Sequence, residues 1–430
     1  MTFLRLFYNL CFPVVLVMML PSILLRMVRR GNYRHKFGQR FGMYSRRVLD
    51  KLSGHRWTWV HAVSVGEVMI ALKLIEAVRE RQPDLRVVLS TTTSTGYRLA
   101  HRRKSPFLEP IYTPLDIPGV VARALNAAQP DRLILVEAEV WPNMMAAAKK
   151  RGLPVILINA RLSPRSERRY RIIRPWAAAL FNQLDALCAQ EPADARRWER
   201  LGVRKEKIRM TGSVKFDPAR EGLGPPPRDL RPILENLGVS VSAPVLLGGS
   251  TFEGEEVILA ECLRDLRARI PGLFLILVPR HAERAASLHA RLSDMGFQVA
   301  LRQGGEPVNA PEILLVNTTG ELKDWYAQAT VVFMGKSLTA RGGQNPAEAI
   351  AAGRPVLFGP NMRNFASLAR QMTESGGAIV VPDAQALRSA VEELLDDPVR
   401  RETMAAAAAT CLNVHRGATA RTIAVLEEFP

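Results

Sequence analysis

The chain has 430 residues, of which 47% are hydrophobic and 23% charged; this is the composition of a globular protein and excludes disordered and fibrous classes. A chain of this length holds two or three domains with cores of their own. The formal net charge is +18, and the basic excess lies entirely in residues 1–212, which hold 37 Lys and Arg against 16 Asp and Glu, while residues 213–430 hold 22 against 25.

The first predicted element is a hydrophobic segment at residues 6–25, an uncharged run long enough to cross a hydrocarbon core. Pro13 and Pro21 interrupt it, so it is also compatible with a broken amphipathic element along the membrane interface, or with a hydrophobic helix packed on the body. One basic residue precedes the run and eight follow within residues 26–47, which places the main body in the cytoplasm. We therefore expect residues 1–30 to anchor the protein to a membrane.

From about residue 56, short β-branched or Leu-rich runs alternate with stretches of helical period. In the first half this pattern predicts strands at residues 57–62, 86–90, 133–136, 155–159 and 186–189. In the second half it predicts strands at residues 244–247, 273–278, 297–300, 313–316, 331–334 and 356–358. Strands that alternate with helices form parallel sheets covered on both faces, so the fold class is α/β with two units.

The pattern breaks between the two series, at residues 212–218 and at the proline run 225–227. Such a run is an ordinary surface loop in many proteins, but between two α/β series it indicates an interdomain linker. We predict a first domain over residues 31–212, a linker over 213–228 and a second domain over 229–430, whose last helix could cross back to the first. Two similar units joined near the middle also suggest a central cleft.

The first strand leads into Val63-Ser64-Val65-Gly66-Glu67, where the apolar run breaks at Gly66 into a helix. Glu67 therefore lies just past the carboxyl end of a parallel strand, the edge at which open α/β sheets bind ligands. The positive end of the helix favours a negative charge there, so the carboxylate can serve as a general base. A Glu that only benefits from the helix dipole explains the position alone equally well.

Two further strand ends of the first half carry charged side chains. Glu137 and Glu139 follow the strand at 133–136 and either position an acceptor hydroxyl or pair with arginine, and Arg161 follows the next strand. Five arginines lie within residues 165–174, a run that is usually a solvated helix face. Beside a membrane segment it favours acidic lipid. Nucleic acid is disfavoured, because basic and aromatic residues do not interleave and no recognition module is present.

In the second half, polar and glycine-rich segments follow successive strands. Gly335-Lys336 follows one strand, and the segment from Gly342 to Glu348 opens the next helix, where free amides can face a phosphate and Glu348 can accept ribose hydroxyls. Arg280 and His281 close the strand at 273–278, and residues 248–251 close the strand at 244–247. A plain loop capped by Asn345 is the alternative. The segment is neither a Walker loop nor a Rossmann fingerprint.

Together these motifs resemble the 3-deoxy-D-manno-octulosonic acid (Kdo) transferases of lipopolysaccharide biosynthesis, inverting glycosyltransferases of the GT-B fold. The resemblance covers nearly the whole chain: the hydrophobic start, then residues 63–67, 137–143, 160–163, 212–217, 249–251, 279–281, 320–322 and 342–348. It implies two Rossmann-like α/β domains facing a central cleft, the first binding the acceptor and the second the CMP-sugar. It further implies transfer of Kdo from CMP-Kdo to a hydroxyl of lipid IVA, the lipid A precursor, without a metal or cofactor, at the cytoplasmic face of the bacterial inner membrane.

The resemblance also implies roles for individual residues. Glu67 matches the catalytic base. The acceptor-binding positions are Ser64, Gly66, Glu137, Glu139 and Arg161. The donor-binding positions are Ser250, Thr251, Arg280, His281, Glu321, Gly335, Lys336, Gly343, Asn345 and Glu348. Phe252 stands where many members carry a histidine, which puts a polar donor contact at this position in doubt.

Two other functions fit part of the sequence. A GT-B transferase or epimerase that uses a UDP-sugar would share the architecture. A non-catalytic, membrane-bound protein that binds anionic lipid would explain the basic half, but not a phosphate-binding segment in the near-neutral half. The four cysteines are far apart and form no metal-ligand spacing, so we expect free thiols, a reducing compartment and no structural zinc.

Overall fold

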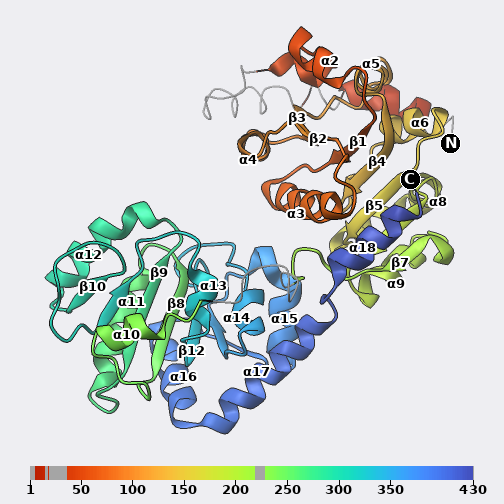
Figure 1. The fold of residues 1–430 in the computed structure, drawn as a ribbon. Coiled ribbons are helices and arrows are strands. Elements are labelled where there is room, and N and C mark those ends of the chain that lie inside the picture. The colour runs from red at the N-terminus through yellow and green to blue at the C-terminus, as the bar shows by residue number, and fades with distance from the viewer. Residues whose placement is uncertain (1–4, 15–17, 19–35, 218–227, 430) are drawn as a thin grey trace. The chain divides into compact units, whose positions relative to one another are not determined.

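The computed structural model describes residues 5–14, 18, 36–217 and 228–429 (Figure 1). The chain divides into two compact units: unit 1 comprises Met1–Asp217 with Gly417–Pro430, and unit 2 comprises Pro218–Arg416. The division falls inside the segment predicted as the linker, and the last helix returns to unit 1. Each unit contains a parallel sheet, which confirms the predicted α/β class.

The sheet of unit 1 has seven described strands in the order β3-β2-β1-β4-β5-β6-β7. Their bounds are β1 Trp57–His61, β2 Val87–Thr91, β3 Leu108–Tyr112, β4 Pro130–Val136, β5 Val155–Ala160, β6 Ala186–Ala189 and β7 Ile208–Met210. The described helices are η1 Phe37–Phe41, α2 Arg46–Leu52, α3 Val65–Arg81, α4 Ser94–Arg102, α5 Pro118–Ala128, α6 Pro142–Lys150, α7 Pro164–Ile172, α8 Arg174–Phe181, α9 Pro192–Arg200, η2 Lys205–Lys207 and α18 Ala418–Glu427.

Both faces of this sheet are buried, because alternate side chains of each strand enter different cores. Trp57 and Trp59 of β1 pack with α5, α6, α8 and α9 on one face. Val60 of the same strand packs with α3, α4 and α18 on the other, where Ile423 and Leu426 complete the core. Helix α18 thus belongs to the hydrophobic core of unit 1, although more than 200 residues separate it from β7 in the sequence.

The sheet of unit 2 also has seven described strands, in the order β10-β11-β9-β8-β12-β13-β14. Their bounds are β8 Val245–Thr251, β9 Phe274–Pro279, β10 Val299–Leu301, β11 Ile313–Leu315, β12 Val331–Met334, β13 Val356–Phe358 and β14 Ala378–Val380. The described helices are α10 Arg231–Asn236, α11 Glu255–Arg267, η3 Ala282–Arg284, α12 Ala285–Asp294, α13 Leu322–Tyr326, α14 Ala347–Ala351, η4 Arg363–Phe365, α15 Ala366–Glu374, α16 Ala384–Asp396 and α17 Pro398–Asn413.

The strand order creates one switch point in each sheet. In unit 1 the chain runs outward from β1 through β2 to β3 and then crosses to β4 on the other side of β1. In unit 2 it runs outward from β8 and later crosses to β12 on the other side of β8. Loops leaving two such strands diverge at the carboxyl edge, and this is where open α/β sheets bind ligands. The loops after β1 and β4, and those after β8 and β12, therefore form the two candidate regions.

The sequence analysis missed β3, β7 and β14. In β3 the polar Glu109 and the helix- and strand-breaking Pro110 disguise the strand. The structure places β3 at the sheet edge, where a proline is tolerated, and Lys51 and Lys104 neutralise the buried Glu109 at 2.9 and 2.8 Å. The other two strands are three residues long and partly exposed.

The predicted membrane segment is described only in part. Residues 5–14 are helical, and most of the remainder of 6–25 lies outside the described residues. Within the part of the chain that the structure describes, no helix combines the length and apolarity that a membrane crossing requires.

Candidate active site

Glu67 is held in place at the start of α3 by a reciprocal capping box. Ser64 Oγ accepts the Glu67 N–H at 3.3 Å, and the Glu67 carboxylate accepts the N–H of Val63 at 2.8 Å through Oε2 and that of Ser64 at 3.3 Å through Oε1. Glu67 therefore has a local role at the helix start, as the alternative to a base required. Because each carboxylate oxygen can accept a second hydrogen bond, capping orients the group without excluding its use as a base. Gly66 is exposed beside it.

Glu137 and Glu139 lie near Glu67, in the loop that follows β4. Burial raises the pKa of Glu139 to about 7, and the negative charges of Glu67 and Glu137 add to the effect. Burial and Glu67 also raise the pKa of Glu137, while Lys215 and Arg161 act to lower it. The β1/β4 switch point thus collects three carboxylates from two segments that are 70 residues apart.

Two cations balance this acidic cluster. Arg161, predicted on the acceptor side, interacts electrostatically with Glu137. Lys215 was given no role by the sequence analysis, although it stands in one of the quoted motifs, residues 212–217. Burial lowers the pKa of Lys215, Glu137 acts to raise it, and Arg161 acts to lower it. The sequence did not indicate that Lys215 interacts with Glu137, because the two residues are distant in sequence.

The loop that carries Lys215 is fixed from three directions. Asn159, at φ 51°, accepts the Val214 N–H at 3.0 Å through its side chain. Lys73 of α3 donates to the carbonyls of Val214 and Asp217 at 2.9 and 2.6 Å. The Asp217 carboxylate in turn accepts the N–H groups of Gly417 and Thr419 at the start of α18. Lys215 is therefore presented by a rigid turn.

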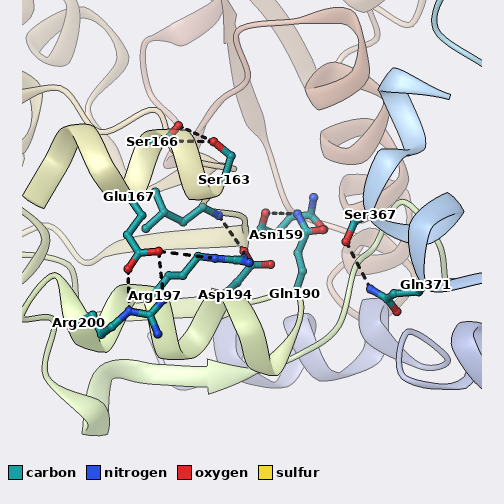
Figure 2. Close-up of polar contacts among 11 residues, drawn as sticks. Asn159, Ser163, Ser166, Glu167, Gln190, Asp194, Arg197, Arg200, Ser367 and Gln371 are labelled. Carbon is teal, nitrogen blue, oxygen red and sulfur yellow. Dashed lines mark hydrogen bonds and ion pairs between the residues drawn. The ribbon is translucent and has the colours of Figure 1, made fainter. Parts of the chain in front are cut away.

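A polar network ties the Arg161 loop to α9 (Figure 2). Glu167 of α7 binds Arg200 at 2.7 and 3.0 Å. Asp194 accepts the Leu162 N–H and binds Arg197, both at 3.0 Å. Ser163 caps α7, as its hydroxyl accepts the Ser166 N–H at 3.1 Å (Figure 2). These contacts hold the backbone that follows Arg161.

The arginine run of residues 165–174 is exposed, as predicted for a solvated face, but large apolar side chains accompany it. Ile172 is 83% exposed and Trp176 is 40% exposed. The Trp176 ring lies 5.9 Å from the ring of Phe7, which belongs to the helical residues 5–14. That helix also exposes Leu6 and Leu10. We call this set of five arginines and their apolar neighbours the α7–α8 surface.

In unit 2, the backbone after β8 and β12 is tied together by Glu255, a residue that the sequence analysis overlooked. Its fully buried carboxylate accepts four main-chain N–H groups. Oε2 accepts those of Phe252 at 2.8 Å and Lys336 at 2.7 Å, and Oε1 accepts those of Ser337 at 2.9 Å and Leu338 at 3.0 Å. Acid residues are common in a first helical turn, so nothing in the sequence distinguished this one.

The side chains of this region gather around Phe252. The His281 ring meets it edge-on, with centroids 5.7 Å apart, and Lys336 Nζ lies 4.9 Å from its ring centroid. The exposed Arg280 lies beside Thr251 of the neighbouring strand, whose carbonyl accepts the Arg280 N–H at 3.1 Å. The structure therefore places the predicted donor residues His281 and Lys336 against the Phe252 ring. Ser250 stands beside them in a bulge of β8, at φ 52°.

The glycine-rich segment serves packing more than the sequence analysis expected. A side chain on Gly335 would lie 2.3 Å from the carbonyl oxygen of Ser250. The Gly343 N–H donates to the Lys336 carbonyl at 2.8 Å, and the Gly342 N–H donates to the Asn361 carbonyl at 2.9 Å. The prediction that amides here are free for a phosphate is therefore wrong for these two glycines. Both N–H groups already donate to backbone carbonyls of neighbouring loops.

The helix that this segment opens is short. Helix α14 begins at Ala347 and has five residues, with Pro346 as its N-cap. The Asn345 side chain accepts the Ala347 N–H at 3.2 Å, which is the local role named as the alternative. The Glu348 side chain is exposed. A helix this short contributes little dipole, so any anion here depends on side chains such as Lys336.

Glu321 is engaged in ion pairs instead of being gathered around Phe252. Arg302 binds its carboxylate at 3.1 and 3.2 Å, and the Thr318 hydroxyl donates to it at 2.7 Å. Arg228 approaches to 3.5 Å. Glu321 follows β11, and β9 lies between β11 and β8 in the sheet. The prediction that Glu321 contacts the donor stays a prediction, and its visible role is to anchor a loop.

Comparison with known proteins gives consistent results along the chain. Residues 35–218 match the family model described as 3-deoxy-D-manno-octulosonic-acid transferase (kdotransferase). The chain is 33% identical to the 3-deoxy-D-manno-octulosonic acid transferase of Haemophilus influenzae, over 99% of this chain and 98% of that protein. It is 35% identical to the protein of that name from Bordetella pertussis, over 95% of this chain and 96% of the relative.

Solved structures with the same fold share little sequence with the chain. MurG from Acinetobacter baumannii has a TM-score of 0.54 at 14% identity, over 87% of this chain and 100% of that one. A UDP-N-acetylglucosamine 2-epimerase also has a TM-score of 0.54 at 14% identity, over 86% and 96%. These likenesses concern the fold alone, and they support the predicted GT-B class.

Proposed function

The chain belongs to the 3-deoxy-D-manno-octulosonic acid (Kdo) transferase family, and from that premise we propose that it moves Kdo from CMP-Kdo onto a hydroxyl of lipid IVA and releases CMP. We infer Kdo as the transferred sugar from the names of the related transferases. CMP-Kdo as donor and lipid IVA as acceptor are the finer parts of the proposal. The observation that carries it is the oriented carboxylate of Glu67, beside Glu137 and Glu139 at the switch point of unit 1.

In this mechanism Glu67 accepts the proton of the acceptor hydroxyl while the hydroxyl oxygen bonds to the anomeric carbon of Kdo. The bond from that carbon to the phosphate oxygen of CMP breaks, and CMP leaves with the electron pair. Because burial raises the pKa of Glu139 to about 7, its carboxyl can carry a proton near neutral pH and donate a hydrogen bond to the acceptor. Arg161 and Lys215 offset the remaining negative charge.

On the donor side, the departing phosphate requires positive charge, which Arg280 and Lys336 can supply. Both lie at the carboxyl edge of the unit 2 sheet, where the Arg280 backbone bonds Thr251 and Lys336 lies against Phe252. Glu255 holds the backbone of Lys336 and so presets the position of its side chain. His281 and Glu348 complete the polar groups that we assign to the nucleotide.

We further assign membrane binding to the α7–α8 surface. Exposed arginines beside Ile172 and Trp176 suit a surface that carries both phosphates and acyl chains. The acyl chains of a lipid acceptor would then stay in the bilayer while its sugar reaches Glu67. Residues 6–25 and the cytoplasmic face of the bacterial inner membrane belong to the same proposal.

Replacement of Glu67 by Gln tests the assignment of the base. We expect kcat to fall at least about a hundredfold, with little change in the Kd for CMP-Kdo, because a neutral amide cannot accept the proton. Product formation from purified protein, lipid IVA and CMP-Kdo is followed by mass spectrometry. Glu76→Gln, an exposed site on the same helix, is the matched control.

Since Glu67 also caps α3, the thermal midpoint of each variant must be measured as well. A capping loss of about 1 kcal/mol would lower the midpoint by a few degrees and leave the folded protein in excess at assay temperature. A folded Glu67→Gln variant with full turnover contradicts the assignment of the base. Transfer from UDP-sugars but not from CMP-Kdo contradicts the proposed donor.

A further inference from the structure

Residues 137–141, which carry Glu137 and Glu139, form a loop between β4 and α6 that we call the acidic loop. The sheet holds its first residue, because the Glu137 N–H donates to the Ile158 carbonyl of β5 at 3.0 Å. Glu137 has φ 65°, a left-handed backbone that residues other than glycine adopt only at a cost. Such a conformation persists only where the surrounding structure holds it, so the contacts at the other end of the acidic loop also decide where its carboxyl groups lie.

The other end of the acidic loop is the start of α6, a helix without a capping side chain of its own. Asp116, which is buried in the loop after β3, supplies the cap instead. Its carboxylate accepts the N–H of Asn143 at 2.9 Å and that of Met144 at 2.8 Å. The first turn of α6 is therefore fixed by a residue 27 positions before Asn143.

The buried Asn143 side chain connects this cap to the amino-terminal helix of residues 5–14. Asn143 Nδ2 donates to the Asp116 carbonyl and to Asn9 Oδ1, both at 2.6 Å. Tyr8 of the same helix interacts electrostatically with the Asp116 carboxylate. Two successive residues of the amino-terminal helix, Tyr8 and Asn9, are thus joined to the cap of α6.

The amino-terminal helix has two faces with different surroundings. Leu6 and Leu10 are 69% and 73% exposed, on the side to which we assign membrane binding. Tyr8 and Asn9 are half-buried. Attachment to a bilayer requires only the exposed apolar face, since a side-chain amide adds neither apolar area nor charge. The hydrogen bond from Asn143 to Asn9 therefore indicates a second role for this helix.

We propose that Asn9 is a positioning residue of the reaction, which through Asn143 fixes the acidic loop and with it the carboxyl groups of Glu137 and Glu139. The inference rests on the proposed function and goes beyond it, because it gives residues 5–14 a part in the chemistry besides attachment. Asn9 acts here through Asn143 and not on the substrate. A displacement of about 1 Å in a group that contacts the substrate can lower a rate by about a hundredfold, so a loosened acidic loop must slow the transfer.

The test is a double-mutant cycle of Asn9→Ala, Asn143→Ala and the double variant, assayed with lipid IVA in detergent so that membrane attachment does not limit the rate. We expect kcat to fall about tenfold in Asn9→Ala, with little change in the KM for CMP-Kdo. The double variant should match Asn143→Ala within about twofold, because the two side chains act as one unit. Asn182→Ala is the control, since the Asn182 side chain joins Gly202 and Arg204 at 2.8 and 3.0 Å elsewhere in unit 1, and it should leave kcat unchanged.

Hydrogen exchange followed by mass spectrometry tests the inference without the reaction. It needs only Asn9→Ala, so it does not depend on the folding of Asn143→Ala. The main-chain amides of the acidic loop should exchange roughly three- to tenfold faster in Asn9→Ala than in wild type, because an anchor worth one hydrogen bond is lost. Residues 182–204 should exchange alike in both proteins.

Three results would overturn the inference. They are equal exchange of the acidic loop in Asn9→Ala and wild type, additive effects of the two substitutions on kcat, and a kcat defect that appears on vesicles but not in detergent. Failure of the proposed function is distinguishable from these, since the wild-type protein would then make no product from CMP-Kdo.

Discussion

At the scale of single residues, the cap observed at Glu67 and the base that we propose for it make compatible demands. A cap must hold its carboxylate against the amides of Val63 and Ser64, and a base must be held at a constant angle to the hydroxyl that it deprotonates. The same hydrogen bonds serve both purposes. The alternatives that the sequence left open for Glu67, a local role at the helix start or a base, therefore do not exclude each other.

The raised pKa of Glu139 predicts a pH effect on stability. Between its usual pKa and about 7 the folded protein binds a proton that the unfolded chain does not, so stability falls as the pH rises through this interval. Glu139→Gln removes the cost of ionising the buried group. Relative to wild type, the free energy of unfolding of the variant should be larger by on the order of 2 kcal/mol at pH 8 and nearly unchanged at pH 4.

Thermal midpoints of both proteins at pH 4 and pH 8 check this prediction for Glu139. Glu76→Gln, at an exposed position, should show no such pH-dependent difference. If the gap between Glu139→Gln and wild type is the same at both pH values, the carboxyl is not held in a protonation-sensitive environment.

Glu255 carries the second prediction at the residue scale. Glu255→Gln keeps one carbonyl oxygen but points an NH₂ group at main-chain N–H donors, so two of the four hydrogen bonds are lost. We expect the KM for the donor to rise about tenfold with a smaller change in kcat, because the Lys336 and Phe252 loops lose their common anchor.

Steady-state kinetics with varied CMP-Kdo separates the two constants for Glu255→Gln. The adjacent, exposed Glu253→Gln should behave as wild type. A fall in kcat alone would show that Glu255 does not act through donor binding.

At the scale of elements, two hydrogen bonds to Asp217 hold the start of α18, the helix with which the chain returns to unit 1. Asp217 accepts the N–H groups of Gly417 at 2.8 Å and Thr419 at 2.7 Å, at the positive end of this helix. Asp217→Ala should therefore lower stability by about 1–2 kcal/mol, as loss of a helix cap does. It should also reduce turnover, because the turn carrying Lys215 ends at Asp217.

Asp383→Ala is the matched control for Asp217, since Asp383 caps α16 of unit 2 through the Ala386 N–H at 2.8 Å. It should cost similar stability and leave turnover unchanged at a temperature where both variants are folded. Equal turnover in the two variants would argue against a functional role of the 212–217 turn.

The element scale also explains which strands were predictable. Long apolar runs such as β5 can be recognised as strands from the sequence, because a strand buried on both faces must be continuously hydrophobic. Strand β3 did not, since Glu109 is acceptable there only after Lys51 and Lys104 reach it from other segments. Predicting β3 would have required knowing which lysines lie beside Glu109, and the hydrophobic pattern of the strand does not show this.

At the scale of the whole molecule, the asymmetry of charge predicts where a membrane binds. Residues 1–212 hold the entire basic excess, and the α7–α8 surface concentrates it beside exposed Ile172 and Trp176. Arg165→Gln combined with Arg169→Gln should weaken binding to vesicles of phosphatidylglycerol and phosphatidylcholine by roughly thirtyfold, at about 1 kcal/mol for each charge. Binding of the wild-type protein should weaken at 1 M salt.

Vesicle sedimentation measures this partitioning. The control replaces the exposed Arg269 and the half-buried Arg388, two arginines on the surface of unit 2, and should bind as wild type. If both double variants lose affinity equally, net charge and not the α7–α8 surface governs the binding.

The sequence by itself determined the α/β class, most of the strands and the place of Glu67 at a strand end, because hydrophobic period and helix-start chemistry are local properties. Only the tertiary structure decided what each polar group faces. It brought Glu137 and Glu139 to Glu67, set Lys215 against them, gave the amides of residues 336–338 to Glu255 and joined Asn9 to Asn143. Those outcomes depend on strand order and on residues distant in the chain, since electrostatic and hydrogen-bonding partners are chosen by proximity in space and not in sequence.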